Sequence, residues 1–164
     1  MGVSADIIRS WRHPRRVMAA RLSEGLREDR ALVFLIVACL LMFVAQWPRL
    51  QLEALIDPDI PLEARLGGAL MGWLFIAPLA LYAIAALSRI IARLLGGQGS
   101  WLSARMALFW SLLAVTPLWL LNGLVTSVNG PGLVRDISGL IALAAFVLIW
   151  LSSMVEAETI RGNQ

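Results

Sequence analysis

The 164-residue sequence has no lysine, one cysteine, one histidine and little charge of either sign. Charged residues make up 15% of the chain and apolar residues 59%, whereas soluble domains average about 25% and about 45–50%. The mean hydropathy is +0.77. Because the apolar excess lies in long stretches without any charge, the composition excludes a soluble enzyme, a disordered chain and a transmembrane β-barrel.

The residues needed for catalysis or metal binding are also scarce. Cys39 is alone, so it has no disulfide partner within the chain, and it lies in an apolar run where a small buried residue is expected. His13 has no Cys, Asp or Glu at a spacing suited to metal ligation. The uncharged stretches hold no paired Asp, no His-Glu-x-x-His motif and no Ser–His pairing. We therefore expect a non-enzymatic protein without catalytic residues, cofactor or metal site.

Four uncharged stretches are long enough to cross a bilayer, for which a helix needs about 20 apolar residues. They predict an all-α, polytopic membrane protein whose transmembrane bundle occupies residues 31–155, with spans at about 31–47, 66–88, 106–128 and 137–155. Pro48 is expected to end the first span, and the Asn-Gly-Pro-Gly sequence from Asn129 the third. Residues 50–62 are too polar and too interrupted to form a fifth span.

The arginines predict the orientation of the four spans. Residues 1–30, the connection between spans two and three, and the tail at 156–164 together carry eleven arginines, whereas the connections on the other side carry three. Basic residues are retained on the cytoplasmic side. We therefore expect both termini in the cytoplasm of a cell with the chain in its inner membrane. A basic excess in such a protein favours anionic lipid as a partner, and no nucleic acid.

The first 30 residues form a basic segment in front of the spans. Their apolar residues recur at three- and four-residue steps, which places them on one helical face: Ile8, Trp11, Met18, Leu22 and Leu26. Pro14 suits the first turn of a helix from about Pro14 to Glu28. The segment is expected to be an amphipathic helix on the cytoplasmic membrane surface, although its arginines could instead serve only to fix the topology.

A second basic region lies between spans two and three, around the glycine-rich sequence from Leu95 to Ser100. This sequence lacks the Lys-Ser/Thr of a P-loop, so a tight turn is its simplest interpretation. Its flanking arginines and tryptophan also suit a lipid headgroup or an acidic partner. Together the two regions define an expected lipid or partner surface of nine residues: Arg9, Arg12, Arg15, Arg16, Arg21, Arg89, Arg93, Trp101 and Arg105.

Three residues within the spans are expected at helix–helix contacts. Gly68 and Gly72 form a small-xxx-small step that lets another helix approach closely, either within the chain or from a second copy. Asn122, with Thr116 near Pro117, is expected to hydrogen-bond a neighbouring helix, or else to line a small polar niche.

Two short stretches resemble the bacterial branch of the Yip1 family. One is Trp11-Arg12-His13-Pro14-Arg15-Arg16-Val17, and the other runs from Arg89 through Gly96-Gly97-Gln98-Gly99-Ser100 to Trp101, followed by Ala107-Leu108-Phe109-Trp110-Ser111 and Thr116-Pro117. The resemblance loosely covers residues 10–155. It implies an integral membrane protein without catalytic residues. Eukaryotic members act in vesicle trafficking with small GTPases, a role that does not carry over to bacteria.

Four functions follow from these features. The favoured one is a non-enzymatic, Yip1-like protein that organises membrane lipid or scaffolds a membrane complex. An accessory subunit of a respiratory, photosynthetic or transport complex is the first alternative. A small homo-oligomeric transporter or channel is the second, although the spans contain no charged residue to line a path. A membrane enzyme is the least favoured.

Overall fold

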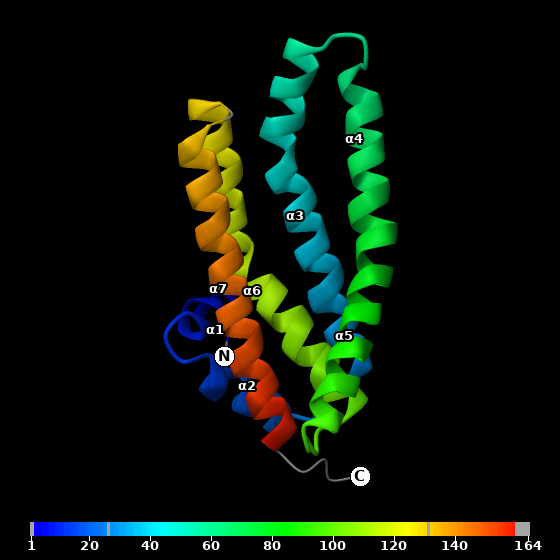
Figure 1. Cartoon of the computed structure of the whole chain (residues 1–164), viewed down its shortest axis with the longest axis vertical. Coiled ribbons are helices and arrows are strands. Elements are labelled where there is room, and N and C mark those ends of the chain that lie inside the picture. Colours follow the sequence, from blue (N-terminus) through cyan, green and yellow to red (C-terminus); the bar gives the residue numbers. More distant parts are fainter. Residues whose placement is uncertain (1, 26, 131, 160–164) are drawn as a thin grey trace.

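The computed structural model describes residues 2–25, 27–130 and 132–159, and within these ranges the ordered elements are helices (Figure 1). The elements in chain order are α1 (Val3–Ser10), α2 (Pro14–Ser23), α3 (Glu28–Ile56), α4 (Leu62–Met71), the π-helix η1 (Gly72–Ile76), α5 (Ala77–Leu94), α6 (Trp101–Asn129) and α7 (Leu133–Thr159). The glycine loop, defined as residues 95–100, joins α5 to α6 at the lower end in Figure 1. We call that end the glycine-loop end. The α3–α4 and α6–α7 connections lie at the opposite end.

Four long helices are apolar enough to cross a membrane, which confirms the expected number. They are Glu28–Ile56, Leu62–Leu94, Trp101–Asn129 and Leu133–Thr159, the second being formed by α4, η1 and α5 together. Each extends beyond its uncharged stretch because the flanking polar residues also have helical backbone. At 1.5 Å per residue, 29 residues of α3 or α6 span about 43 Å, longer than the roughly 30 Å hydrocarbon core.

The first long helix does not end at Pro48, where the sequence suggested a stop. α3 continues through Pro48 to Ile56. A proline inside a helix removes one backbone hydrogen bond and favours a bend, but it need not end the helix when neighbouring turns are supported. Here Arg49 forms an ion pair with Glu53 one turn later, at 2.7 Å, and Phe43 meets Trp47 one turn earlier.

Proline also explains the irregular turn of the second long helix. Pro78 supplies no N–H to the carbonyl of Leu74, four residues before it. The π-helical turn η1 lies where this ladder is interrupted, between α4 and α5. This helix is the least covered of the four, because only 6% of its apolar window is buried within the chain, compared with 56% for α6.

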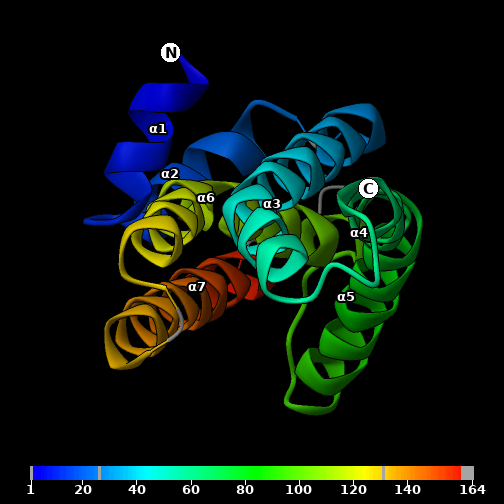
Figure 2. The same cartoon turned by 90° about the horizontal axis from the view of Figure 1, so that it is seen from above.

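α6 lies at the centre of the bundle, packed along α3 on one flank and α7 on the other (Figures 1 and 2). A continuous run from Met106 to Thr116 is buried. Pro117 follows this run directly, and the hydroxyl of Thr116 donates to the carbonyl of Leu113 at 2.8 Å. That carbonyl is the one that Pro117 leaves without its usual N–H partner, so Thr116 compensates for the proline within the helix.

The amino-terminal segment differs from the expected single surface helix. It forms two short helices, α1 and α2, which pack on α6 and α7. Met18 is fully buried, and Leu22 packs against the core. The indole N–H of Trp11 donates to the carbonyl of Ala114, near the middle of α6, at 2.8 Å. The apolar face is therefore covered by protein rather than lipid, and Leu26 lies outside the described residues. The start at Pro14 is as expected.

Candidate functional site

The expected lipid or partner surface divides into arginines held inside the fold and arginines left exposed. Arg21 belongs to the first group: its side chain is 11% exposed, and it pairs with Asp6 at 2.6 Å. Arg105 pairs with Glu28 and lies over the ring of Tyr82. Arg89 pairs with Glu158 at 2.9 Å, both side chains being 11% exposed. These three arginines join helices to one another and are poorly placed to meet a lipid headgroup.

The second group lies on α2 and the turn before it. Arg12, Arg15 and Arg16 are exposed, and none of them has an ion-pair partner among the residues that the structure describes. We call these three the basic surface. Val17 and Met18, the next residues of α2, are buried against the bundle. The arginines are therefore presented on a helix that is fixed in place by its other face.

The remaining residues of the expected surface stay at the periphery. Arg9 is exposed and lies 3.9 Å from Asp6. Arg93 is exposed near the end of α5, and Trp101 is 48% exposed at the start of α6. By contrast, the arginines at the opposite end are paired with carboxylates of the chain. The pairs are Arg49–Glu53, Arg65–Asp57 and Arg135–Asp136.

The glycine loop already holds a carboxylate from its own chain. Glu158 of α7 accepts hydrogen bonds from the backbone N–H of Gly99 and from Arg89, both at 2.9 Å to the same oxygen. Its backbone carbonyl accepts from the N–H of Gln98 at 3.2 Å. A side chain at Gly97 or Gly99 would collide with Glu158 or with the carbonyl of Ala157. The loop therefore clasps the last turns of α7, and its glycines allow that approach.

This clasp predicts the effect of removing one charge. Glu158→Gln should lower the free energy of unfolding by about 1–3 kcal/mol, because a buried Arg89 loses its counter-charge while the hydrogen bond from Gly99 is kept. Cys39 is fully buried, so thermal unfolding in detergent can be followed by the reaction of its thiol with a maleimide. The control is Glu156→Gln, on the same helix, whose side chain has no ion pair in the described part of the chain. Equal melting temperatures for both variants would contradict the clasp.

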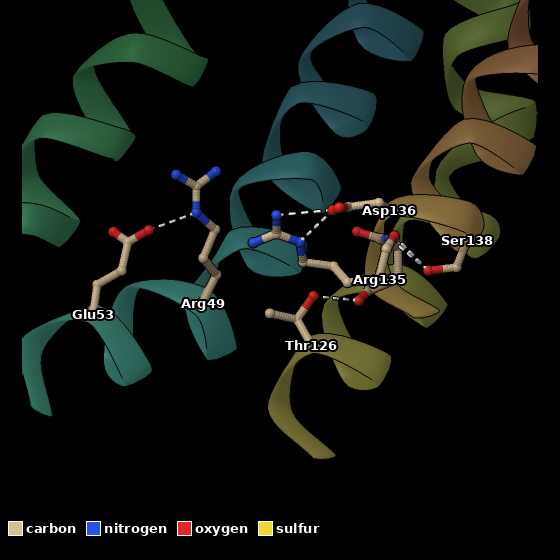
Figure 3. Close-up of polar contacts among 7 residues, drawn as sticks. Arg49, Glu53, Thr126, Arg135, Asp136 and Ser138 are labelled. Atoms are coloured by element: carbon tan, nitrogen blue, oxygen red, sulfur yellow. Dashed lines mark hydrogen bonds and ion pairs between the residues drawn. The ribbon is translucent and has the colours of Figure 1, made fainter. Parts of the chain in front are cut away.

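The three residues expected at helix contacts behave differently from one another. Asn122 bridges α6 to α7: its side-chain amide donates to the carbonyl of Arg135 at 2.9 Å and to the hydroxyl of Ser138 at 2.7 Å (Figure 3). Gly68 and Gly72 have open space where a Cβ would lie, so no helix of this chain packs closely on them. The close approach is instead at Gly123, where a Cβ would collide with the carbonyl of Ala45 on α3.

A cavity of about 890 Å³ lies between α3, η1, α5, α6 and α7. Its wall is mostly apolar, with Leu81, Leu112 and Phe146 contributed by three different helices. Trp150 also lines it, stacked on Phe146 with ring centroids 5.8 Å apart, and its buried indole N–H has no acceptor among the described residues. The cavity exists because α3 and α7 both pack on α6 but are not packed on each other within the described ranges.

Charged and polar groups gather where the cavity meets the opposite end of the bundle. Arg49 on α3 and Arg135 and Asp136 on α7 line it there, together with Thr126 of α6. Figure 3 shows the side chain of Arg135 extending from α7 toward α3, on which Arg49 and Glu53 form their ion pair. We call Arg49 and Arg135 the mouth arginines. They are the first basic residues after the uncharged part of α3 and before that of α7, the one signal in the sequence for this site.

An apolar space of this size is expected to be filled. At about 24 cal/mol per Å³, leaving about 890 Å³ empty would cost about 21 kcal/mol, more than the 5–15 kcal/mol that stabilises a typical domain. Small apolar cavities stay dry and take up apolar molecules. In a bilayer the abundant molecule of that kind is lipid hydrocarbon.

These features define a polytopic, all-helical membrane protein with four long apolar helices and an apolar cavity among them. The chain is matched by the family model of the Yip1 domain over residues 8–157. It therefore belongs to the Yip1 family, as the resemblance implied. No curated protein and no solved structure matches the chain.

Proposed function

We propose that this Yip1-family protein is non-enzymatic and organises anionic lipid on the cytoplasmic side of a bacterial inner membrane. The observation that supports this proposal is the unequal pairing of arginines at the two ends. Arg12, Arg15 and Arg16 are exposed without a carboxylate partner among the described residues, whereas Arg49, Arg65 and Arg135 at the opposite end are paired. Exposed arginines that the chain leaves unneutralised are available to lipid phosphates.

The charge bias supports the same side of the membrane. The amino-terminal segment and the α5–α6 connection carry most of the arginines of the chain, and such segments are retained in the cytoplasm. The cytoplasmic leaflet is the one with a negative surface potential, where each basic residue contributes roughly 1 kcal/mol of attraction. Because α2 is anchored by Met18, its arginines need not order a flexible segment before they bind lipid.

The test is the preference of the full chain for anionic lipid. The protein is reconstituted in phosphatidylcholine bilayers containing a trace of spin-labelled phosphatidylglycerol, and the motionally restricted fraction is measured by electron paramagnetic resonance. Arg12→Gln/Arg15→Gln/Arg16→Gln should lose most of the preference, each arginine accounting for up to about a fivefold change in relative association. The preference should also weaken with added salt.

The matched control keeps the charge and changes only the side-chain type. Arg12→Lys/Arg15→Lys/Arg16→Lys should retain most of the preference, because a diffuse attraction to anionic lipid depends mainly on net charge. If the glutamine variant binds spin-labelled phosphatidylglycerol as strongly as the native chain, the basic surface does not organise anionic lipid.

A scaffold for a larger complex, or an accessory subunit, is favoured by a different observation. The long helix of α4, η1 and α5 has 6% of its apolar window buried, and its Gly68 and Gly72 face open space. Such a helix is suited to packing against another membrane protein or a second copy. Native mass spectrometry after mild extraction should then show a larger mass at fixed stoichiometry, and Gly68→Leu should reduce it to the mass of the single chain.

A further inference from the structure

The cavity and its mouth form a binding site separate from the basic surface. We propose that the cavity holds one acyl chain of a phospholipid, whose phosphate lies between Arg49 and Arg135. This inference does not rest on the proposed function, because the mouth arginines and the basic surface occupy different parts of the fold and use different residues.

The shape of the cavity fits a single hydrocarbon chain. On α7 its lining runs from Asp136 to Trp150, which corresponds to about 21 Å along the helix axis. One leaflet of a bilayer provides about 15 Å of hydrocarbon, half of the core thickness. The wall between these limits is apolar, and the volume of about 890 Å³ lies in the usual range of ligand sites.

The charges at the mouth select the head of that lipid. The mouth arginines come from α3 and α7, which are joined mainly through α6, so each brings a guanidinium to the same opening from a separate helix (Figure 3). Guanidinium groups bind phosphate oxygens in a bidentate manner. The side chains remain partly exposed, at 54% for Arg49 and 35% for Arg135, which leaves N–H groups free for a further acceptor.

The carboxylates at the mouth set the net charge of the preferred lipid. Glu53 pairs with Arg49, and Asp136 pairs with Arg135, so the opening carries two positive and two negative groups. Asp136 is 62% exposed on its side chain and bonds Arg135 through one oxygen. Its second oxygen is available to an amine. A phosphate flanked by an ammonium group, as in phosphatidylethanolamine, complements this arrangement better than a purely anionic head.

The experiment uses the full chain, extracted in a mild detergent after reconstitution into liposomes of equal parts phosphatidylethanolamine, phosphatidylglycerol and diacylglycerol. Native mass spectrometry counts the lipid that remains bound. The native chain should retain one phospholipid, phosphatidylethanolamine in excess of phosphatidylglycerol. Arg49→Gln/Arg135→Gln should lower its retention by about tenfold, whereas Arg12→Gln/Arg15→Gln, with the same loss of charge at the basic surface, should leave it unchanged.

A second pair of variants tests the cavity itself. Ala80 lines the cavity, so Ala80→Trp should fill part of it and reduce retention. Ala83 is exposed on the same helix and does not line the cavity, so Ala83→Trp is the matched control and should retain the lipid. Maleimide labelling of the buried Cys39 verifies that each variant is folded.

Several results would overturn the inference. One is a native chain that retains no lipid, and another is equal retention by Ala80→Trp and Ala83→Trp. Retention of diacylglycerol as strongly as phospholipid would show that the mouth does not recognise phosphate. A preference for phosphatidylglycerol would keep the phosphate site but reject the role assigned to Asp136. None of these results bears on the basic surface, which is tested separately.

Discussion

Replacing Gly123 with leucine is expected to prevent α3 and α6 from packing. Gly123 is buried on α6 at the point where that helix passes Ala45 of α3. A Cβ at this position would collide with the carbonyl oxygen of Ala45 and lie 3.2 Å from its carbon. These are backbone atoms of a long helix, which cannot move aside as a flexible side chain can. The two helices would have to separate along much of their shared length.

The expected loss is larger than for an ordinary overpacked core. Overpacking by a few atoms costs about 1–3 kcal/mol, and a leucine set against backbone should exceed about 4 kcal/mol, the range of exceptional substitutions. Cys39 is buried on α3, so Gly123→Leu should expose its thiol to maleimide at temperatures where the native chain is protected.

The control for this prediction is another glycine of the same kind. Gly68 has no atom within 4 Å of a Cβ position, so Gly68→Leu should leave the protection of Cys39 within about 0.5 kcal/mol of the native value. If both variants label alike, the structure places the contact between α3 and α6 wrongly.

The two glycine positions also show what the sequence could and could not predict about helix contacts. The step from Gly68 to Gly72 is visible within one helix, and it led us to expect close packing there. Gly123 stands alone in α6, and its importance comes from Ala45, which is 78 positions away. A local motif shows that a close approach is possible, but only the arrangement of the helices determines where one occurs.

The number of spans was predictable for the opposite reason. Each long helix must keep an uncharged segment in hydrocarbon, and a charge-free run is a property of consecutive residues. Helix ends were less predictable, as Pro48 shows, because ion pairs such as Arg49–Glu53 continue the helix into the polar region.

The cavity could not be predicted, because its lining is assembled from separate helices. Arg49 and Arg135 are 86 positions apart in the sequence and meet at one opening only after α3 and α7 have packed on α6. Asn122 was easier to place, since an amide within a span needs a hydrogen-bonding partner. Its partner proved to be the first turn of α7.

Arg21 is the residue for which pattern and structure differ most, and it gives the second large prediction. It was grouped with the exposed arginines because its neighbours are basic. In the structure its guanidinium pairs with Asp6 of α1 and lies 4.3 Å from the ring centroid of Trp110. The hydroxyl of Ser10 accepts from the indole N–H of Trp110 at 3.0 Å. Arg21 therefore fixes both amino-terminal helices to α6.

Removing this arginine should leave a carboxylate stranded in the fold. Asp6 has 14% of its side chain exposed, and its other cationic neighbour, Arg9, is 3.9 Å away. Breaking one partner out of a buried pair costs about 3–5 kcal/mol, and the loss of a cation–π contact adds to it. For a chain of this length, that corresponds to a melting temperature lower by roughly 10 °C. The measurement is thermal unfolding of Arg21→Gln followed by Cys39 labelling.

Two further variants separate this role from lipid binding. Arg16→Gln removes an exposed arginine of the same helix, so it should change the melting temperature little while weakening the preference for anionic lipid. Arg21→Gln should do the reverse. Asp6→Asn/Arg21→Gln should recover part of the lost stability, because the stranded carboxylate is gone, and the coupling should be about 0.5–3 kcal/mol. A double variant as unstable as the sum of the single ones would show that Asp6 and Arg21 act independently.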